Sequence, residues 1–424
     1  MKTYPKKIIL SAILLGSSQS SWSTDFYIRS GASGTNNGTN WTNAWSATNK
    51  INYASIKPGD TIYFAAGTYG QLSINQSGTS GNPITFKRAT SGSHGADDTG
   101  WNATYDGRVI IDGGIEVGIT KDTNFITIDG ATRYGIWARN GSRGIGTRNG
   151  GRANNLTLRY LESGDPGAYK NNEDGIQGVG NNLIVEYCYI HDNDSIATHG
   201  DGIQWFEGNN IIIRYNIFKN NGQMTMLGEA AWSTYANDIQ IYYNVFYNRG
   251  GTHYNGISTH LGSPQAGHFM RVYNNTFDLE AKDNSGYDSI FNIKPYGTVE
   301  FKNNAMQYSN VASVNQATSS YNGYDNSGQY SNYNVPSGAN SAVTVDLGFV
   351  NVALADYHLT ATSPLKGKGT NVGLTSDFEG NPVPTIPSIG AFESTGVPTP
   401  AIPGGGAVSS VMLPPTLKSA KYIP

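Results

Sequence analysis

The sequence predicts an all-β protein built as a single-stranded solenoid, in which each repeat forms one turn of a parallel β-helix. Between residues 154 and 305, apolar residues at the centre of strand-like runs recur 27, 28, 28, 31 and 29 residues apart: Leu158, Val185, Ile213, Ile241, Val272 and Phe301. A second series follows about eighteen residues later in each repeat, in EDGIQ, GDGIQ, GEAAW, NGIST and DSIFN. Asparagines form a third series: Asn216, Asn244, Asn275 and Asn304. Three series with one period indicate stacked β-coils.

The composition fits a turn-rich β protein. The chain has 424 residues with 53 glycines, and only 14% of the residues are charged. A solenoid grows in one direction, so a chain of this length can form a single unit, which we expect to be a monomer. The formal net charge is −3 and Lys and Arg form no block, which argues against a nucleic-acid partner.

Residues 1–23 have the pattern of a secretory signal peptide. Lys2, Lys6 and Lys7 form a basic start, residues 8–15 are apolar but too few to span a bilayer, and Ser21-Trp-Ser23 is a small-x-small cleavage site. A buried N-terminal strand is the alternative interpretation. We expect cleavage after Ser23 and a secreted or periplasmic protein with neither a lipid anchor nor a membrane span.

The first coils are expected near the segment KPGDTIYFAAGTYG at residues 57–70, with further strand-like runs to residue 87. This segment resembles the opening of many secreted right-handed β-helix proteins, including the alginate- and chondroitin-cleaving lyases. The resemblance covers residues 27–113 and implies a right-handed parallel β-helix. A helix between residues 41 and 55 would cap the open end of the stack.

Residues 134–155 are rich in Gly and Arg and include Arg143 and Arg148. The glycines predict a loop beside the stack. The arginines are either solvated loop charges or contacts for an anionic chain.

Some columns of the repeat have a structural explanation. Arg159, Glu186 and Arg214 fall one coil apart and would alternate in sign along one face. The asparagine column can form hydrogen bonds between coils, as in the pectate lyase superfamily, which this stretch resembles. Cys188, the only cysteine, lies one coil before Asn216 and is expected to be a buried spacer.

The C-terminal part divides at residue 393. Residues 355–393 resemble the closing segment of many secreted β-helix proteins, where it covers the last coil. From residue 394 the chain is rich in Pro and Gly without a period and is predicted to be a flexible tail. The expected organisation is a signal peptide at 1–23, a β-helix domain at 24–393 and a tail at 394–424.

One column does not have a structural explanation. Asp174, Asp201 and Glu229 precede the first apolar residue of the next run by 9, 10 and 10 residues, so they are 27 and 28 residues apart. Neighbouring acids would then lie about 5 Å apart, which is unfavourable unless they share a proton or a cation. The alternative is that Asp-Gly forms two ordinary turns. An aspartate two residues before an inward isoleucine also reaches the surface only if the chain bends between them.

The surroundings of this column favour a functional role. Glu173 and His199 lie close to the aspartates in the chain, and the aromatic residues Trp205, Trp232 and Tyr235 follow the acids. Aromatic side chains beside acids are typical of sugar-binding sites, although either tryptophan could instead be packed. His253, His260 and Lys294 come from the next coils. We therefore expect Trp205, Trp232, Tyr235, His253, His260, Arg143 and Arg148 to contact substrate.

Two catalytic interpretations remain open. In one, Glu173, Asp174 and Asp201 bind Ca²⁺, and Lys294 or a histidine such as His199 is the base in β-elimination on an acidic polysaccharide. This resembles the β-helix polysaccharide lyases and is the interpretation we favour. In the other, two acids hydrolyse a glycosidic bond. This resembles the polygalacturonases, whose motifs NTDG, GDD, GHGIS and RIK are similar to NEDGI, GDGI, NGIST and NIK here. The chain departs from these motifs at Asn255, which replaces the His of the third, and at Asn292, which replaces the Arg of the fourth. A third interpretation is a non-catalytic carbohydrate-binding protein.

Overall fold

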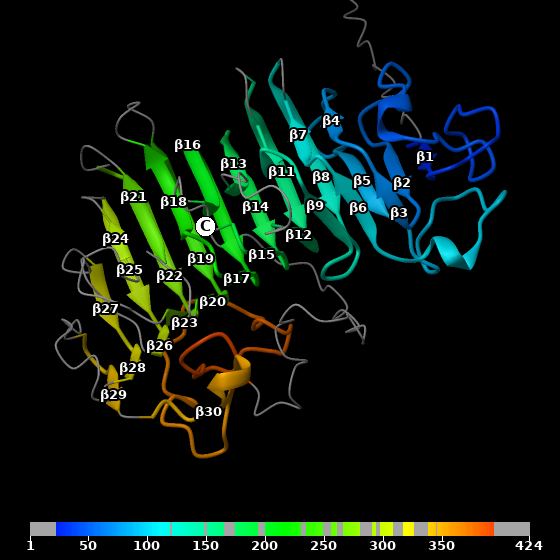
Figure 1. Ribbon diagram of the computed structural model, residues 1–424. Helices are drawn as coiled ribbons and strands as arrows, with labels where there is room; N and C mark the ends of the chain where they lie inside the picture. The colour runs from blue at the N-terminus through cyan, green and yellow to red at the C-terminus, as the bar shows by residue number, and fades with distance from the viewer. Residues whose placement is uncertain are drawn as a thin grey trace, which may run out of the picture.

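The computed structural model describes residues 23–118, 121–147, 151–164, 174–193, 200–229, 235–248, 256–260, 266–279, 291–293, 297–307, 317–325, 338–344 and 346–393. In these residues, parallel strands follow one another around a stack of coils (Figure 1). The parallel strands form three ladders, which we name sheets A, B and C, and one further pair of strands near the C-terminus is antiparallel. The predicted all-β parallel β-helix is confirmed.

Sheet A contains the longest strands, and its members pair in parallel along the whole stack: β1 (Asp25–Ile28), β2 (Thr61–Phe64), β5 (Ile84–Arg88), β8 (Thr123–Asp129), β11 (Ala153–Arg159), β14 (Leu183–Glu186), the second half of β16 (Asp201–Arg214), β19 (Ala236–Tyr242), β22 (Phe269–Tyr273), β25 (Thr298–Lys302) and β27 (Ala317–Ser320).

Sheet B follows sheet A in each coil and has short strands: β3 (Gly67–Tyr69), β6 (Val109–Asp112), β9 (Ile136–Arg139), β12 (Leu161–Ser163), β15 (Tyr189–His191), β17 (Ile217–Lys219), β20 (Val245–Asn248), β23 (Thr276–Leu279), β26 (Ala305–Gln307), β28 (Gly323–Asp325) and β29 (Ala342–Thr344). Sheet C closes the coil with β4 (Leu72–Ile74), β7 (Ile115–Val117), β10 (Arg143–Gly146), β13 (Asp174–Val179), the first half of β16, β18 (Gln223–Glu229), β21 (Ile257–His260) and β24 (Phe291–Ile293).

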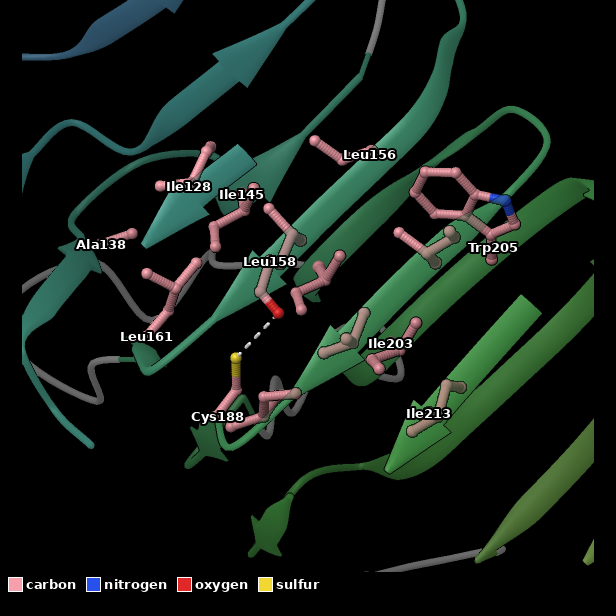
Figure 2. Close-up of a cluster of buried hydrophobic side chains, with 14 of the residues drawn as sticks. Ile128, Ala138, Ile145, Leu156, Leu158, Leu161, Cys188, Ile203, Trp205 and Ile213 are labelled. Carbon is pink, nitrogen blue, oxygen red and sulfur yellow. Dashed lines mark hydrogen bonds between the residues drawn. The ribbon is translucent and has the colours of Figure 1, made fainter. Parts of the chain in front are cut away.

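The interior of the stack is filled by columns of identical or similar side chains. Phe218, Phe246 and Phe277 stack on successive coils with ring centroids 4.8 and 4.7 Å apart. Figure 2 shows the same core around Cys188, whose Sγ lies 3.6 Å from the Leu158 carbonyl oxygen. Burial raises the pKa of the Cys188 thiol to about 12, so this residue is the inert spacer that the sequence predicts.

The asparagine column forms a continuous hydrogen-bonded ladder at the corner between sheets A and B. Each Nδ2 donates to the Oδ1 of the next coil at 3.0 Å, from Asn216 to Asn244, to Asn275 and to Asn304. On the outer face of sheet A, Arg214 Nε donates to Glu186 Oε2 at 2.7 Å, on neighbouring strands, as the alternating charges predict. Both columns stabilise the stacking of the coils.

The N-terminal end is capped without an α-helix in the described residues. A single 3₁₀ turn, η1 (Thr48–Lys50), occupies the stretch where we expected a helix. Trp45 instead closes the end by pairing with Ile28 and stacking on Phe26, with ring centroids 5.1 Å apart. A second short turn, η2 (Ala103–Tyr105), lies in the excursion between β5 and β6. Aromatic packing therefore provides the cap.

The C-terminal segment reaches further than the closing segment we expected. After β30 (Phe349–Asn351), η4 (Val352–Leu354) and β31 (Asp356–Leu359), residues 360–393 run back along the outside of several coils (Figure 1). Gly390 donates its N–H to the Asn303 carbonyl oxygen at 2.7 Å, and Tyr243 donates to Glu393 at 3.3 Å. The segment therefore braces the stack in addition to covering its last coil. None of the helices in the described residues is long and apolar enough to cross a bilayer.

Candidate functional site

Asp174 and Asp201 lie on neighbouring strands at the start of sheet C. Asp174 opens β13 and Asp201 opens β16, and the two residues are register partners. The Asp201 N–H donates to Asp174 Oδ1 at 2.8 Å. Because adjacent strands are about 4.8 Å apart, the two acids occupy neighbouring rungs. This part of the predicted column is confirmed.

Glu229 does not continue the column, and its predicted register is wrong. The register partner of Asp201 on the next coil is Gln223, whereas Glu229 stands opposite His260 at the far end of β18. The cause is a change in loop length. Three residues connect β17 to β18, whereas nine connect β15 to β16, so the strand starts earlier in the coil. The sequence period stays constant because a longer connection follows β18.

Arg143 is the residue that extends the column on the other side. It opens β10 and is the register partner of Asp174. The expectation that residues 134–155 form a loop beside the stack is wrong, because β9, β10 and the start of β11 are strands of the stack itself. The column therefore reads Arg143, Asp174, Asp201 and Gln223 on four successive strands.

The Asp-Gly dipeptides are parts of strands rather than turns. Gly175 faces the core, because a methyl group added there would lie 2.7 Å from Ile190 Cγ2 of sheet B. Ile176 is buried in the same core. Two successive inward residues bend the strand, so that Asp174 shares the outer face with Gln177. This is the bend between the aspartate and the inward isoleucine that the sequence analysis required. Gly202 and Ile203 repeat the pattern one coil further.

The charged side chains at the start of these strands are buried, and Asp174 is hydrogen-bonded to two glutamine side chains in a row. The exposed fractions are 1% for Arg143, 1% for Asp174 and 0% for Asp201. Gln177 Nε2 donates to Asp174 Oδ2 and also to Gln204 Oε1, the latter at 2.7 Å. Burying charge is unfavourable unless the groups are paired and hydrogen-bonded. Sequence reasoning missed the two glutamines, although the repeated DGIQ motif contains both.

The described residues cover the predicted calcium site only in part. Ca²⁺ takes six to eight oxygen ligands, about 2.3–2.6 Å away. Both oxygens of Asp174 already accept hydrogen bonds from protein N–H groups, and Arg143 occupies the neighbouring rung. Within the described part of the chain, no group of three or more His, Cys, Asp or Glu side chains could hold a metal ion. Glu173, the remaining predicted ligand, lies outside the described residues.

Trp205 is a core residue, and its predicted role in gripping substrate is wrong. Its side chain is 1% exposed, and its Nε1 donates to the Gly180 carbonyl oxygen at 2.9 Å. Figure 2 shows it among the buried side chains. The neighbouring coil makes room for the indole with Gly178, where a methyl group would lie 2.7 Å from the ring. The packed alternative is therefore correct for this tryptophan.

The other predicted contacts are only partly described. Tyr235 is half-buried and packs against the core. His260 ends β21, and its main chain pairs with that of Glu229. The remaining predicted site residues lie outside the described residues: Glu173, His199, Trp232, His253, Lys294 and Arg148.

A second charged cluster lies on the outer face of sheet B, where the sequence predicted nothing. His191 bonds to Asp192 Oδ2 at 2.7 Å and to Glu162 Oε1 at 3.2 Å, one carboxylate at each ring nitrogen. Glu162 also pairs with Arg108, which stacks on Trp137 4.3 Å from its ring centroid. The cluster combines residues from four coils, so no local sequence motif predicts it.

The charge state of His191 follows from this geometry. Burial alone lowers the pKa of the imidazole, but the hydrogen bonds and negative charges of Asp192 and Glu162 outweigh burial and raise it. The same hydrogen bond lowers the pKa of the Asp192 carboxyl, against the effect of burial. His191 therefore keeps its proton to a higher pH than a free imidazole, and its bonds to the two carboxylates tie strands of sheet B together.

The architecture has a counterpart among solved structures. The crystal structure of pectate lyase Pel9A superposes with a TM-score of 0.50 and 17% sequence identity, over 87% of this chain and 96% of that chain. The chain shares the fold of a pectate lyase. A mannuronic acid specific polysaccharide family 6 lyase from human gut microbiota has a TM-score of 0.39 and 15% identity, over 67% of this chain and 59% of that one. The alginate lyase of Paenibacillus sp. str. FPU-7 has a TM-score of 0.39 and 14% identity, over 71% of this chain and 96% of that one.

Comparison at the level of sequence gives no further assignment. No family model matches the chain, and no curated protein matches it. At 17% identity, the likeness to Pel9A establishes the architecture alone.

Proposed function

We propose that the protein is a lyase that cleaves an acidic, uronate-containing polysaccharide by β-elimination, with the column of Arg143, Asp174 and Asp201 as its centre. The observation that carries this proposal is the column itself, with a guanidinium and two carboxylates on three successive strands. A solenoid that needed only stability would place uncharged residues there, because buried ionic groups contribute little net stability. The shared architecture with Pel9A supports the proposal as an analogy of fold.

The reaction assigns a task to each member of the column. A base removes the C5 proton of the uronate, and the electrons of the C5–H bond form the C4=C5 double bond. The C4–O bond breaks, and the leaving oxygen gains a proton. Arg143 would bind the uronate carboxylate, and Asp201 would transfer the proton to the leaving oxygen. Asp174 is a positioning residue, since its two oxygens hold the Asp201 main chain and the Gln177 amide.

The base is assigned by distance along the stack. Strand β24, whose last residue precedes Lys294 in the sequence, is three strands beyond β16 in sheet C, or about 14 Å along the axis. That separation exceeds the size of one sugar ring. His199 precedes Asp201 by only two residues in the chain. We therefore assign the base to His199, and no step of this mechanism uses calcium.

A retaining glycoside hydrolase is the second candidate, and one observation favours it. Asp174 and Asp201 are one strand spacing apart, about 4.8 Å, close to the 5–5.5 Å between the carboxyl groups of retaining enzymes. An inverting enzyme needs a wider gap for water.

The substrate screen separates these candidates. Pectate, alginate and glycosaminoglycans are offered to the purified protein, and a lyase must produce the ultraviolet absorbance of the C4=C5 bond, whereas a hydrolase releases reducing ends without it. Asp201→Asn is expected to lower kcat about 100- to 10,000-fold. Asp112→Asn, at a 41% exposed carboxylate on sheet B, is the matched control and should leave kcat unchanged. Binding without cleavage of any polymer would instead support a non-catalytic carbohydrate-binding protein.

Substrate must also reach the column. Asp174 and Asp201 are at most 1% exposed, so the proposal requires that a bound oligosaccharide uncover them. A crystal structure with a tetrasaccharide tests this directly, and sugar bound elsewhere with the column still buried would refute the assignment. We also propose secretion, from the pattern of residues 1–23. N-terminal sequencing of the mature protein should then begin at Thr24.

A further inference from the structure

We propose that the C-terminal brace, residues 376–393, is a pH-dependent latch, which is closed on the coils while Asp377, Glu393 and His358 carry protons and loosens as they lose them. The brace contacts the corner between sheets A and B through Tyr215 and Tyr243. The latch therefore holds or fails independently of the proposed lyase activity.

The brace covers a row of stacked tyrosines at this corner. Tyr187, Tyr215 and Tyr243 stack on successive coils, with ring centroids 4.9 and 6.1 Å apart. Tyr215 Oη donates to the Ser376 carbonyl oxygen, and Tyr243 Oη donates to Glu393 Oε1, both at 3.3 Å. The coils therefore hold both ends of the brace through side-chain hydroxyls, which can release it without breaking any strand pairing.

Asp377 and Glu393 are two acids of the brace with uncharged hydrogen-bond donors. Asp377 is 0% exposed, and its carboxyl accepts hydrogen bonds at 2.8–3.0 Å from the main-chain N–H groups of Glu379, Asn381 and Glu393. Glu393 Oε2 accepts from the Ser388 N–H at 2.8 Å. Burial raises the pKa of both carboxyls, and the negative charge of Asp377 raises the pKa of Glu393 further. Ionising the two acids is therefore less favourable in the closed brace than in water.

His358, at 1% exposure, links the brace to β31. Its Nδ1 bonds to Asp356 Oδ1 on the same strand at 2.6 Å, and its Nε2 bonds to Glu379 Oε2 of the brace at 3.2 Å. Its ring packs on Phe392, with centroids 4.4 Å apart. Burial lowers the pKa of the imidazole, but the hydrogen bonds to the two carboxylates outweigh burial and raise it. A neutral imidazole can donate from one nitrogen only, so deprotonation removes one of these two bonds.

The two acids and the histidine act in the same direction. A group whose pKa is raised in the closed brace binds its proton more tightly there than in the open segment. Its contribution to closure is complete below the ordinary pKa and is lost as pH rises through the raised value. The loss begins above about pH 4 for the acids and above about pH 6.5 for His358.

The groups that face the brace from the coils keep their charge over this range. Tyr215 and Tyr243 stay neutral, because burial raises the pKa of both hydroxyls. Arg133 stacks on Phe378, with its guanidinium 4.4 Å from the ring centroid, and stays protonated. The pH dependence of closure therefore comes from the two acids and the histidine.

Hydrogen exchange of the full-length protein, followed by mass spectrometry, tests the latch. Protection factors, which correct for the pH dependence of exchange itself, are compared at about pH 4.5 and about pH 8. The reporting amides bond from the brace to the coils, such as Gly390, whose N–H donates to the Asn303 carbonyl oxygen at 2.7 Å. Each pKa that is one unit higher in the closed brace changes the closing equilibrium tenfold, so we expect protection there to fall about tenfold or more at the higher pH.

Strands β22 and β25 are the internal reference, because local opening of the brace leaves their pairing intact. Their protection should change much less than that of the brace. Equal protection of the brace at both pH values, or higher protection at pH 8, would overturn the proposal. A parallel loss in the brace and in the two strands would overturn it as well, since it would mean that the whole stack opens.

Substitutions assign the effect to its groups. Glu393→Gln keeps an acceptor oxygen but cannot ionise, and His358→Gln cannot be protonated, so each should reduce the loss of protection between the two pH values several-fold. Asp112→Asn, at a 41% exposed carboxylate on sheet B, is the matched control and should leave this loss unchanged. The same loss in both test variants as in the unmodified protein would refute the assignment. If the variants do not fold, the comparison of the brace with β22 and β25 in the unmodified protein decides the question.

Discussion

Replacing Asn244 by alanine tests whether the asparagine ladder holds the coils together. Asn244 is completely buried at the corner between sheets A and B. Its Oδ1 accepts hydrogen bonds from the N–H and the Nδ2 of Asn216, at 2.9 and 3.0 Å. Its Nδ2 donates to the Ile213 carbonyl oxygen at 2.9 Å and to Asn275 Oδ1 at 3.0 Å. The substitution removes these four bonds, and also the longer one that Nδ2 donates to the Tyr242 carbonyl oxygen at 3.2 Å.

The expected loss follows from these contacts. Each hydrogen bond contributes about 1 kcal/mol net, so four bonds amount to about 4 kcal/mol. The buried N–H of Asn216 also loses its acceptor, which adds about 1–3 kcal/mol because no water replaces the carbonyl. We therefore expect Asn244→Ala to lower the free energy of unfolding by about 5 kcal/mol, which is exceptional for a single substitution.

Asn182→Ala is the matched control. Asn182 belongs to a second asparagine stack, in which it donates to Asn155 Oδ1 and accepts from Asn210, both at 2.9 Å, but it is exposed. Water replaces the lost partners there, so the change should cost only the roughly 1–2 kcal/mol by which alanine is strained at the φ of 59° that Asn182 adopts. Urea unfolding followed by circular dichroism gives both values. Equal losses in the two variants would refute the reasoning that burial gives the ladder its strength.

Three further predictions follow from the described contacts. Trp205→Ala should lower the free energy of unfolding by about 3–5 kcal/mol by opening a cavity, as measured by urea unfolding, and a stable variant with weakened polysaccharide binding would contradict the core role. Because the pKa of His191 is raised in the folded protein, its stabilisation is complete below the unfolded value of about 6.5 and is lost as pH rises through the folded value. His191→Gln should therefore reduce the melting temperature more at about pH 5.5 than at about pH 9, and the opposite order would disprove the charged pairing. Gly146→Ala should destabilise the protein by displacing Arg143, and combining it with Arg143→Ala should remove most of that loss; strictly additive losses would mean that the two residues do not touch.

Sheet A and its corner with sheet B could be predicted from the sequence because, from β14 to β28, two residues connect the two sheets in each coil, whereas 20 residues separate β5 from β6 and six separate β8 from β9. A residue with positive φ, such as Tyr187 or Tyr215, ends the sheet A strand in successive coils. The position that follows carries Cys188 or a ladder asparagine. A corner of constant length keeps the apolar, charged and asparagine columns at one spacing, and a period in the sequence then reports true register.

The candidate site could be predicted only where two coils share their local sequence. Asp174 and Asp201 begin the same four-residue motif, DGIQ, and they are register partners. Arg143 begins the sequence Arg-Gly-Ile-Gly, which matches the motif only in its first glycine and its isoleucine. The sequence therefore did not indicate that Arg143 belongs to the column. The burial of Trp205 could not be predicted either, because the space for its ring is provided by Gly178 on another coil.

Glu229 shows why a constant period does not ensure a constant column. In sheet A, Ile211 and Ile239 are register partners 28 residues apart, because 239 − 211 = 28. In sheet C of the same two coils, Asp201 and Gln223 are partners only 22 residues apart, because 223 − 201 = 22. The connections that lead into sheet C from sheet B therefore vary in length, while the corner after sheet A keeps two residues from β14 to β28. Loops tolerate such variation because their backbone lies at the surface, and binding residues concentrate where they join a rigid scaffold. Arg143, Asp174 and Asp201 each open the strand that follows such a connection, which is the position where a solenoid can acquire a specific chemistry without disturbing the ladders that hold it together.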